Sequence, residues 1–463
     1  MTEVSSAPVW GSATGASSRW GTHIGRAEVD VAVIGGGLTG VSTALHLIRE
    51  RPDWTVMLLE ADAIGAGASG LSTGICGPGV GGRIRPLAKR HGPDVAREMF
   101  RYSQDAVRTV VDLVDREGID ADVRPSRHLL GAYTGAQAAM LRKEKADFER
   151  LGLDPAWLSR DEVAARLGHT RYHGALAYDP VVVLDPLKLT VGLASAATRA
   201  GVRVVVGSRV TGMVSARGRV RLQVGTAGSV CARRVVVATD GYTPPDFPYG
   251  RRLVRLRTHV TATRPLTPAE RAGTGWDGYE AVIDQRTFFS YYRLSGGRLL
   301  FGGGPVPRPD APAAASERVF RRLHRELEAT FPMLAGIPLE HRWSGLTSST
   351  LDRLPVVGAV PGRDGVIFAG AWCGHGVSMS VATGRSVAEQ LAAGRSPAGR
   401  PWNRSSTRTP SFGPFTRPAV ASYVAGLDLV DRTGARLDRR RSAPAHLPDS
   451  AGVAAGPADA LQA

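Results

Sequence analysis

Cysteine is scarce in this chain of 463 residues, which has only Cys76, Cys231 and Cys373, far apart in the sequence. Disulfide scaffolds and cysteine-based zinc sites need more cysteines at closer spacing, so both are excluded and no metal site is expected. Such sparing use of cysteine suits a reducing compartment, and we expect a cytoplasmic protein.

Long hydrophobic runs are also missing. The longest apolar stretch, residues 31–48, is interrupted by a cluster of glycines. A membrane-spanning helix needs about 20 mostly apolar residues, and this stretch is better explained as a strand, a turn and a helix. The first 28 residues are small and polar, without the basic start and apolar run of a signal peptide. The sequence therefore predicts neither a membrane partner nor an export signal.

Positive charge is plentiful, but little of it comes from lysine. The formal net charge is +16, from 58 Lys and Arg against 42 Asp and Glu, and only four of the basic residues are lysines. The arginines are spread along the chain rather than gathered in a basic stripe or in a recognisable binding module. We therefore expect no nucleic-acid partner and attribute the arginine excess to coding bias.

Both ends of the chain differ in composition from its middle. Residues 1–28 predict an N-terminal tail, which Trp10 and Trp20 would attach to the body of the protein. Residues 396–463 are rich in Pro, Arg and Ala and predict a C-terminal tail that is largely disordered, with one short helix near 419–429. The chain as a whole is 43% hydrophobic, which is enough for a sizeable core in the body between the tails.

Strand, turn and helix follow one another at both ends of that body. Residues 30–34 predict a strand and 38–50 a helix, and 366–369 predict a strand before a last helix over 377–392. This order predicts an α/β plus α+β fold, in which a Rossmann-like dinucleotide-binding domain is built from discontinuous segments and carries an inserted antiparallel-sheet substrate domain. The first domain would comprise residues 29–90, 185–245 and 345–395, and the second 91–184 and 246–344.

The sharpest local motif is a glycine-rich turn between the first strand and the first helix. Gly35, Gly37 and Gly40 form G-x-G-x-x-G, with Gly36 and Thr39 inside the same turn. The first glycine permits the tight turn, the second lets a pyrophosphate approach the backbone, and the third lets helix and strand pack closely. The N–H groups of the helix start then favour phosphate, so the motif predicts a dinucleotide site.

The segment after the second strand decides which dinucleotide is expected. Glu60 ends that strand, where a carboxylate accepts hydrogen bonds from ribose hydroxyls and repels a 2′-phosphate. Small side chains follow over 61–70 and let backbone lie against a large flat ring, whereas an NAD domain continues with regular β-α alternation. The loop therefore favours FAD. The loop residues expected to contact it are Ala61, Gly67, Ala68 and Ser69.

Three further sets of segments add to the fingerprint and its loop: residues 185–186 with 200–204 and 235–241, 291–294 with 299–304, and 343–358 with 368–376. With them, residues 29–395 resemble the D-amino-acid oxidase-like superfamily of FAD-dependent amine and amino-acid oxidoreductases. The last two sets are most similar to the γ-glutamylputrescine oxidase-type branch.

The resemblance implies further contacts with FAD. Val210 matches a position whose backbone meets adenine, and Ala238 matches a strand end near the dinucleotide. A last helix would direct its N-terminus at the flavin, where it stabilises the negative charge of the reduced ring. The residues implied there are Gly370, Gly374, His375, Gly376 and Val377. Gly345 stands where one branch has a flavin-linking cysteine, and the loop near Ser69 has no histidine, so FAD is expected to be non-covalent.

Two positions depart from the relatives that oxidise free amino acids. Thr347 stands where those relatives often have an arginine for the substrate carboxylate, and residues 373–375 replace a second one in some of them. Arginine suits bidentate carboxylate binding, so the departures favour an amine or a larger substrate. Arg293 stays a candidate carboxylate ligand, with a surface strand position as the alternative, because alternation alone does not orient it.

The resemblance implies an FAD-dependent amine or amino-acid oxidase or dehydrogenase that acts on a small-molecule amine. Hydride would pass from the substrate carbon to flavin N5, water would hydrolyse the imine, and the electrons would go to O₂, forming H₂O₂, or to another acceptor. Some oxidases place a lysine of the substrate domain over the flavin, but no lysine follows Lys188 in this chain. The choice between O₂ and another electron acceptor therefore stays open.

Three residues are candidates for the polar groups of the substrate pocket: Tyr291, Tyr292 and His375. Ordinary sheet packing is the alternative for the tyrosines, and a structural role is the alternative for the histidine. Two other functions stay open: a tailoring enzyme of specialised metabolism that acts on a larger amine-bearing scaffold, and a non-catalytic FAD-holding relative. The sequence does not predict the oligomeric state.

Overall fold

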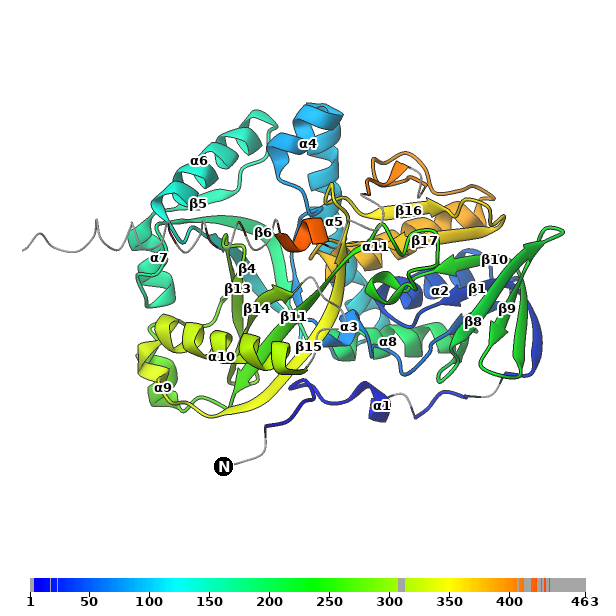
Figure 1. The fold of residues 1–463 in the computed structure, drawn as a ribbon, viewed down its shortest axis with the longest axis horizontal. Helices are drawn as coiled ribbons and strands as arrows, with labels where there is room; N and C mark the ends of the chain where they lie inside the picture. The colour runs from blue at the N-terminus through cyan, green and yellow to red at the C-terminus, as the bar shows by residue number, and fades with distance from the viewer. Residues whose placement is uncertain are drawn as a thin grey trace, which may run out of the picture.

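The computed structural model describes residues 4–16, 18–22, 24–306, 313–405, 408–411 and 418–422, with residues 426, 429 and 433. Most of the segment 396–463 lies outside the described residues, as do residues 423–425, 427 and 428 of the helix expected near 419–429, whose described residues are helical. Two sheets with their covering helices lie side by side along the long axis of the molecule (Figure 1).

The first sheet has a parallel centre, as the strand–turn–helix order predicts. Its central strands run in the order β17 (Val366–Gly370), β10 (Gly228–Val237), β1 (Arg26–Ile34), β2 (Val56–Leu59) and β7 (Arg203–Val205). Antiparallel strands extend it, namely β16 (Val356–Ala359), β9 (Arg219–Val224) and β8 (Val210–Ala216). Residues 31–34 of β1, which pair with β10 on one side and with β2 on the other, are buried.

Helices from distant parts of the sequence cover one face of this sheet. The helix α2 (Leu38–Glu50) begins at the predicted residue and is buried from Leu38 to Ile48. It packs against α11 (Gly376–Ala392) and α8 (Pro186–Arg199), and α5 (Pro93–Glu117) lies against α11. Asp185 caps α8 by accepting hydrogen bonds from two backbone N–H groups of its first turn, each at 2.9 Å.

The second sheet is mostly antiparallel. Its order is β15 (Leu339–Ser349), β11 (Val254–Thr263), β14 (Arg298–Val306), β13 (Ser290–Ser295), β12 (Glu280–Asp284), β4 (Arg124–Gly131), β6 (Ala175–Val183) and β3 (Ile75–Cys76), with β5 (Ala156–Leu158) beside β6. Only β4 and β12 pair in parallel among these strands. The predicted fold class, a Rossmann-like unit of discontinuous segments combined with an antiparallel sheet, is confirmed. The accompanying helices are α4 (Ile84–His91), α6 (Gly135–Arg150), α7 (Arg160–Leu167), α9 (Pro268–Gly273) and α10 (Ala313–Thr330).

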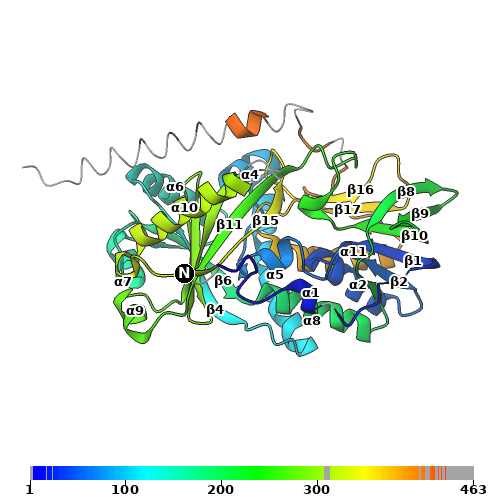
Figure 2. The same cartoon turned by 60° about the horizontal axis from the view of Figure 1, so that its bottom comes forward.

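The N-terminal segment runs along both sheets (Figure 2). Ser5 forms a bridge with His341 at one end, and Gly21 forms a bridge with Val205 at the other. Between them, the Trp10 indole N–H donates to the Gly70 carbonyl at 2.6 Å. Trp20 is buried. The two tryptophans therefore attach this segment to the body of the protein, as the sequence suggests.

The packed part of the chain also continues beyond residue 395. Trp402 is buried, and Asn403 forms a bridge with Val357 beside the first sheet. Arg404 makes a buried ion pair with Asp352. The first residues of the expected tail are therefore part of the core packing, because an indole and a paired guanidinium hold them there.

No helix within the described ranges is long and apolar enough to cross a membrane.

Candidate functional site

A cavity of about 1190 Å³ is lined by residues of both sheets. The fingerprint turn, the loop after Glu60 and the start of α11 contribute one part of its wall, and β11, β13 and β15 contribute another. The structure brings fifteen of the predicted site residues to this wall: Gly35, Gly37, Thr39, Glu60, Ala61, Gly67, Ala68, Ser69, Val210, Ala238, Tyr291, Gly374, His375, Gly376 and Val377.

The glycines of the fingerprint are required by close backbone contacts. Gly35 has φ +113°, and a Cβ atom there would lie 2.7 Å from the carbonyl oxygen of Ala238. A Cβ atom at Gly40 would lie 1.9 Å from the carbonyl oxygen of Gly35. The turn can therefore fold tightly only with glycine at these two positions.

Three residues predicted to bind the cofactor do not line the cavity. The Gly36 N–H donates to a Glu60 carboxylate oxygen at 2.6 Å, and Gly40 packs against the turn. Gly370 faces Asp240 and Phe368, whose atoms a Cβ there would approach to 3.2 and 3.0 Å. These three glycines support the cavity wall without lining the cavity. The direct contact with the cofactor that the sequence predicted for them is therefore corrected.

Glu60 joins the fingerprint to the next loop. Its carboxylate accepts hydrogen bonds from the Gly36 N–H at 2.6 Å and from the Asp62 N–H at 2.8 Å. Burial raises the pKa of this carboxyl, and the two backbone hydrogen bonds oppose the rise. Glu60 thus sits on the cavity wall as a hydrogen-bonded acceptor, as recognition of ribose hydroxyls requires.

Replacing Glu60 with glutamine is expected to weaken cofactor binding by about tenfold, because a neutral amide accepts weaker hydrogen bonds than a carboxylate. Fluorescence titration of FAD into the apo-protein measures this change. Asp62→Asn is the matched control, since Asp62 offers its backbone N–H, not its side chain, to Glu60. Equal affinity of Glu60→Gln and the unsubstituted protein would contradict the role of Glu60.

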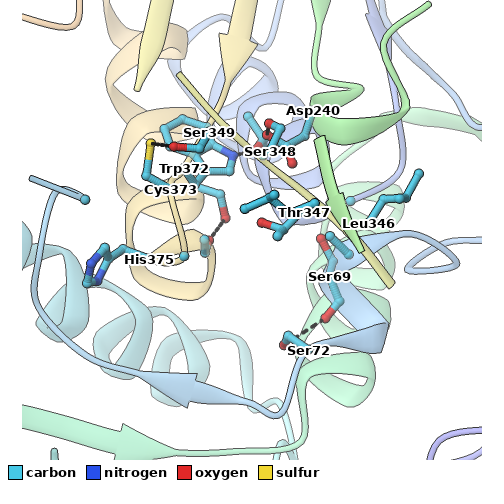
Figure 3. Close-up of a pocket in the computed structure, with 18 of the residues that line it drawn as sticks. Ser69, Ser72, Asp240, Leu346, Thr347, Ser348, Ser349, Trp372, Cys373 and His375 are labelled. Atoms are coloured by element: carbon cyan, nitrogen blue, oxygen red, sulfur yellow. Dashed lines mark hydrogen bonds between the residues drawn. The ribbon is translucent and has the colours of Figure 1, made fainter. Parts of the chain in front are cut away.

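Asp240 is a residue of this site that sequence reasoning missed. Its Oδ1 accepts hydrogen bonds from the Ser348 hydroxyl and from the Ala371 N–H, each at 2.7 Å. It therefore ties the end of β10 to β15 and to the turn before α11 (Figure 3). Burial raises its pKa. The Asp-Gly pair at 240–241 signals a turn and gives no sign of these distant partners.

His375 directly precedes α11, makes no capping hydrogen bond with its side chain, and lines the cavity. Figure 3 shows its ring pointing away from Thr347 and Ser348. The ring lies against Gly79, where a Cβ atom would come within 2.2 Å of the imidazole. Burial lowers the pKa of His375 to about 3, so the imidazole is neutral at physiological pH.

Tyr291 and Tyr292 have different surroundings although they are adjacent. Tyr291 lines the cavity, and its hydroxyl hydrogen-bonds to Thr258. Burial raises the pKa of Tyr291 to about 12, so it stays a neutral donor. Tyr292 does not line the cavity; it stacks on Phe301 at 5.6 Å and bonds to His169 at 2.9 Å. The structure therefore supports the alternative of core packing for Tyr292.

Arg293 is neither a cavity residue nor a surface residue. It is 4% exposed, and its guanidinium donates to the carbonyl oxygens of Thr73 and Leu184. Burial lowers the pKa of Arg293 to about 10, which leaves it charged at physiological pH. Its expected role in binding a substrate carboxylate is corrected: its charge is directed at backbone carbonyls just before β3 and just before α8.

The fold and the cavity together define a dinucleotide-binding protein in which a second sheet completes the site. Glycines at the points of closest approach, an acidic hydrogen-bond acceptor after the second strand and the start of a buried helix all face one cavity. These residues fit FAD. Within the described part of the chain, no group of His, Cys, Asp or Glu is placed to hold a metal ion.

The chain belongs to the family of FAD dependent oxidoreductases known as DAO, whose model matches residues 30–390. It is 30% identical over 375 residues to the probable oxidoreductase OrdL of Rhizobium meliloti (strain 1021), covering 80% of this chain and 85% of that protein. It is 33% identical over 369 residues to the gamma-glutamylputrescine oxidoreductase of Escherichia coli (strain K12), covering 78% and 83%.

The solved structure of glycine oxidase from Geobacillus kaustophilus has the same fold, with a TM-score of 0.66 and 21% identity, over 81% of this chain and 98% of that one. The expected superfamily, its γ-glutamylputrescine oxidase-type branch and the cofactor, FAD held non-covalently, are thus confirmed at the level of the family. The chain is an oxidoreductase enzyme, and a non-catalytic role is not supported.

Proposed function

We propose that this enzyme oxidises a C–N bond of an amine, with FAD as the immediate hydride acceptor. Relatives named gamma-glutamylputrescine oxidoreductase, glycine oxidase and D-amino acid dehydrogenase support a substrate with an amino group. The observation that carries the proposal is the composition of the cavity wall near the start of α11. Tyr291, Thr347 and His375 line it, and all three side chains are neutral at physiological pH.

Two arginines of the cavity wall are engaged by other groups. Arg286 donates to Asp284 and Glu326, and the Arg353 Nε donates to the Gly81 carbonyl at 2.8 Å. Arginine suits bidentate binding of a carboxylate, and Thr347 stands on the wall where relatives that oxidise free amino acids often have one. This departure supports an amine or a larger substrate over a free amino acid.

The chemistry that FAD supplies when bound is acceptance of a hydride from the carbon next to the substrate nitrogen. The start of α11 offers backbone N–H groups to the negative charge that follows. Tyr291 and Thr347 offer hydroxyl groups that orient the substrate, and the strands of the second sheet shield it from water. Water then hydrolyses the imine product, and the electrons pass to O₂, forming H₂O₂, or to another acceptor.

The rate of flavin reduction is expected to rise with pH in a single step. The amine must lose its proton before its carbon can release hydride, while His375 stays neutral because its pKa lies at about 3. Free alkylamines have pKa values of about 10, so the rate of flavin reduction should rise over pH 7–10. Stopped-flow reduction without oxygen measures it. A second step between about pH 5 and 7 would show that a histidine titrates instead.

The proposal is tested with the purified FAD-loaded enzyme. A panel of polyamines, N-methyl amino acids and free amino acids is added without oxygen, and the flavin absorbance near about 450 nm is followed. We expect at least one amine to bleach the band faster than any free amino acid. Peroxide release after air is admitted then identifies O₂ as acceptor. Failure of every amine to bleach the bound flavin would overturn the proposal.

A further inference from the structure

A second histidine, His128 on β4, lines the same cavity as His375. Only 8% of its surface is exposed. Its Nε2 atom is buried and has no hydrogen-bond partner among the described residues. Unpaired buried polar atoms are costly and rare in folded proteins, so each one needs an explanation, and a ligand that supplies the missing hydrogen bond is one.

The sheet is irregular at this residue. Ser126 pairs with Val181, but His128 pairs with Tyr178, so the register between β4 and β6 shifts by one residue between them. A bulge of this kind redirects the side chains beside it, and bulges are frequent next to active sites. Gly77 also lines the cavity and brings no side chain to the ring; a Cβ atom there would lie 3.7 Å from Nδ1.

The groups around His128 leave Nε2 available. Its ring lies 5.9 Å from the ring of Tyr178, a packing distance rather than a hydrogen bond. Two charged residues of the same cavity, Glu144 and Arg83, bond to each other at 3.0 Å, and the neighbouring His375 is neutral. Burial lowers the pKa of His128 to about 4, so the ring offers a neutral nitrogen rather than a charge.

We infer that His128 is a substrate-binding residue whose Nε2 hydrogen-bonds to the nitrogen of the amine in the cavity. The inference rests on the proposed function and extends it, because it assigns to the second sheet the group that orients the reacting nitrogen. A neutral imidazole accepts a hydrogen bond from an amine N–H, and β4 is a rigid support that fixes the direction of that bond.

The test compares His128→Phe and His128→Gln in the FAD-loaded enzyme. Phenylalanine fills the space without the unpaired nitrogen, so the melting temperature without substrate should stay the same or rise. The amine concentration for half-maximal flavin reduction should increase at least about tenfold. Glutamine brings an amide group to a similar position and should recover part of this loss.

His259→Phe is the matched control. His259 also lies in the second sheet, burial also lowers its pKa to about 4, and its Nδ1 is also buried without a partner among the described residues. It differs in that it does not line the cavity and its Nε2 bonds to Ser316 at 3.0 Å. This variant should lower the melting temperature and leave the amine concentration unchanged.

The inference is overturned if an amine reduces the unsubstituted enzyme and His128→Phe needs no more of it. A fall in melting temperature with unchanged amine dependence would assign His128 a structural role and leave the proposed function intact. If no amine reduces the unsubstituted enzyme, the proposed function fails, and the inference fails with it.

Discussion

Gly40→Ala is expected to yield a colourless, destabilised protein. The added Cβ atom would lie 1.9 Å from the carbonyl oxygen of Gly35, which belongs to backbone that no side-chain rotation can move away. Relief requires helix α2 to separate from the turn that approaches the pyrophosphate. Overpacking of this kind costs about 3 kcal/mol or more. We expect at least a hundredfold loss of FAD affinity, roughly the factor that corresponds to this cost.

The measurement is the ratio of flavin to protein absorbance after purification, followed by thermal unfolding with added FAD. Gly135→Ala is the matched control: this glycine begins helix α6, and a Cβ atom there would meet nothing within 4 Å. It should keep its flavin and be as stable as the unsubstituted protein or slightly more so. A yellow Gly40→Ala with an unchanged melting temperature would contradict the close approach of α2 to the turn.

Arg404→Met is expected to cost about 3 kcal/mol of unfolding free energy, because it removes the buried partner of Asp352. Only Arg90 then remains paired with this carboxylate, at 3.3 Å, and its side chain is 53% exposed. The side chains of Arg404 and Asp352 are 7% and 6% exposed. The guanidinium binds both oxygens of the carboxylate and also donates to the Leu354 carbonyl at 3.1 Å. Urea unfolding of the FAD-loaded protein at pH 7 measures the loss as a lower midpoint.

This loss should depend on pH in a defined direction. Burial acts to raise the pKa of Asp352, but the hydrogen bonds and charge of Arg404 outweigh it and hold the pKa below its usual value. A depressed carboxyl pKa stabilises the fold above the unfolded pKa of about 3.9, and the contribution is lost as pH falls through the folded value. The difference between the two proteins should therefore be full at pH 6–8 and shrink below about pH 4.

Arg108→Met serves as the control for this prediction. Arg108 pairs with Asp105 one turn away on α5, and both side chains are more than half exposed, at 59% and 67%. Exposed pairs of this kind contribute little, so its urea midpoint should stay unchanged. Equal midpoints for Arg404→Met and Arg108→Met would show that residues after 395 do not stabilise the body of the protein.

The parts of the molecule that depend on neighbours in sequence were predictable. The fingerprint of Gly35, Gly37 and Gly40, the helix that begins at Leu38 and the acceptor at Glu60 follow from turn chemistry, strand and helix periodicity and phosphate recognition. Each of these features depends on a few consecutive residues, which are enough to define its geometry. The expectation of a dinucleotide followed from them, whereas the family followed from the resemblance of further segments of the chain.

The direction of individual side chains came from packing between distant segments. Side-chain alternation along a strand does not predict that the Arg293 guanidinium donates to the Thr73 and Leu184 carbonyls. His128 lines the cavity next to the point where the register between β4 and β6 shifts. Arg404 is buried where it forms an ion pair with Asp352, which lies far earlier in the chain. Long-range pairings such as these depend on how the two sheets meet, which no short stretch of residues encodes.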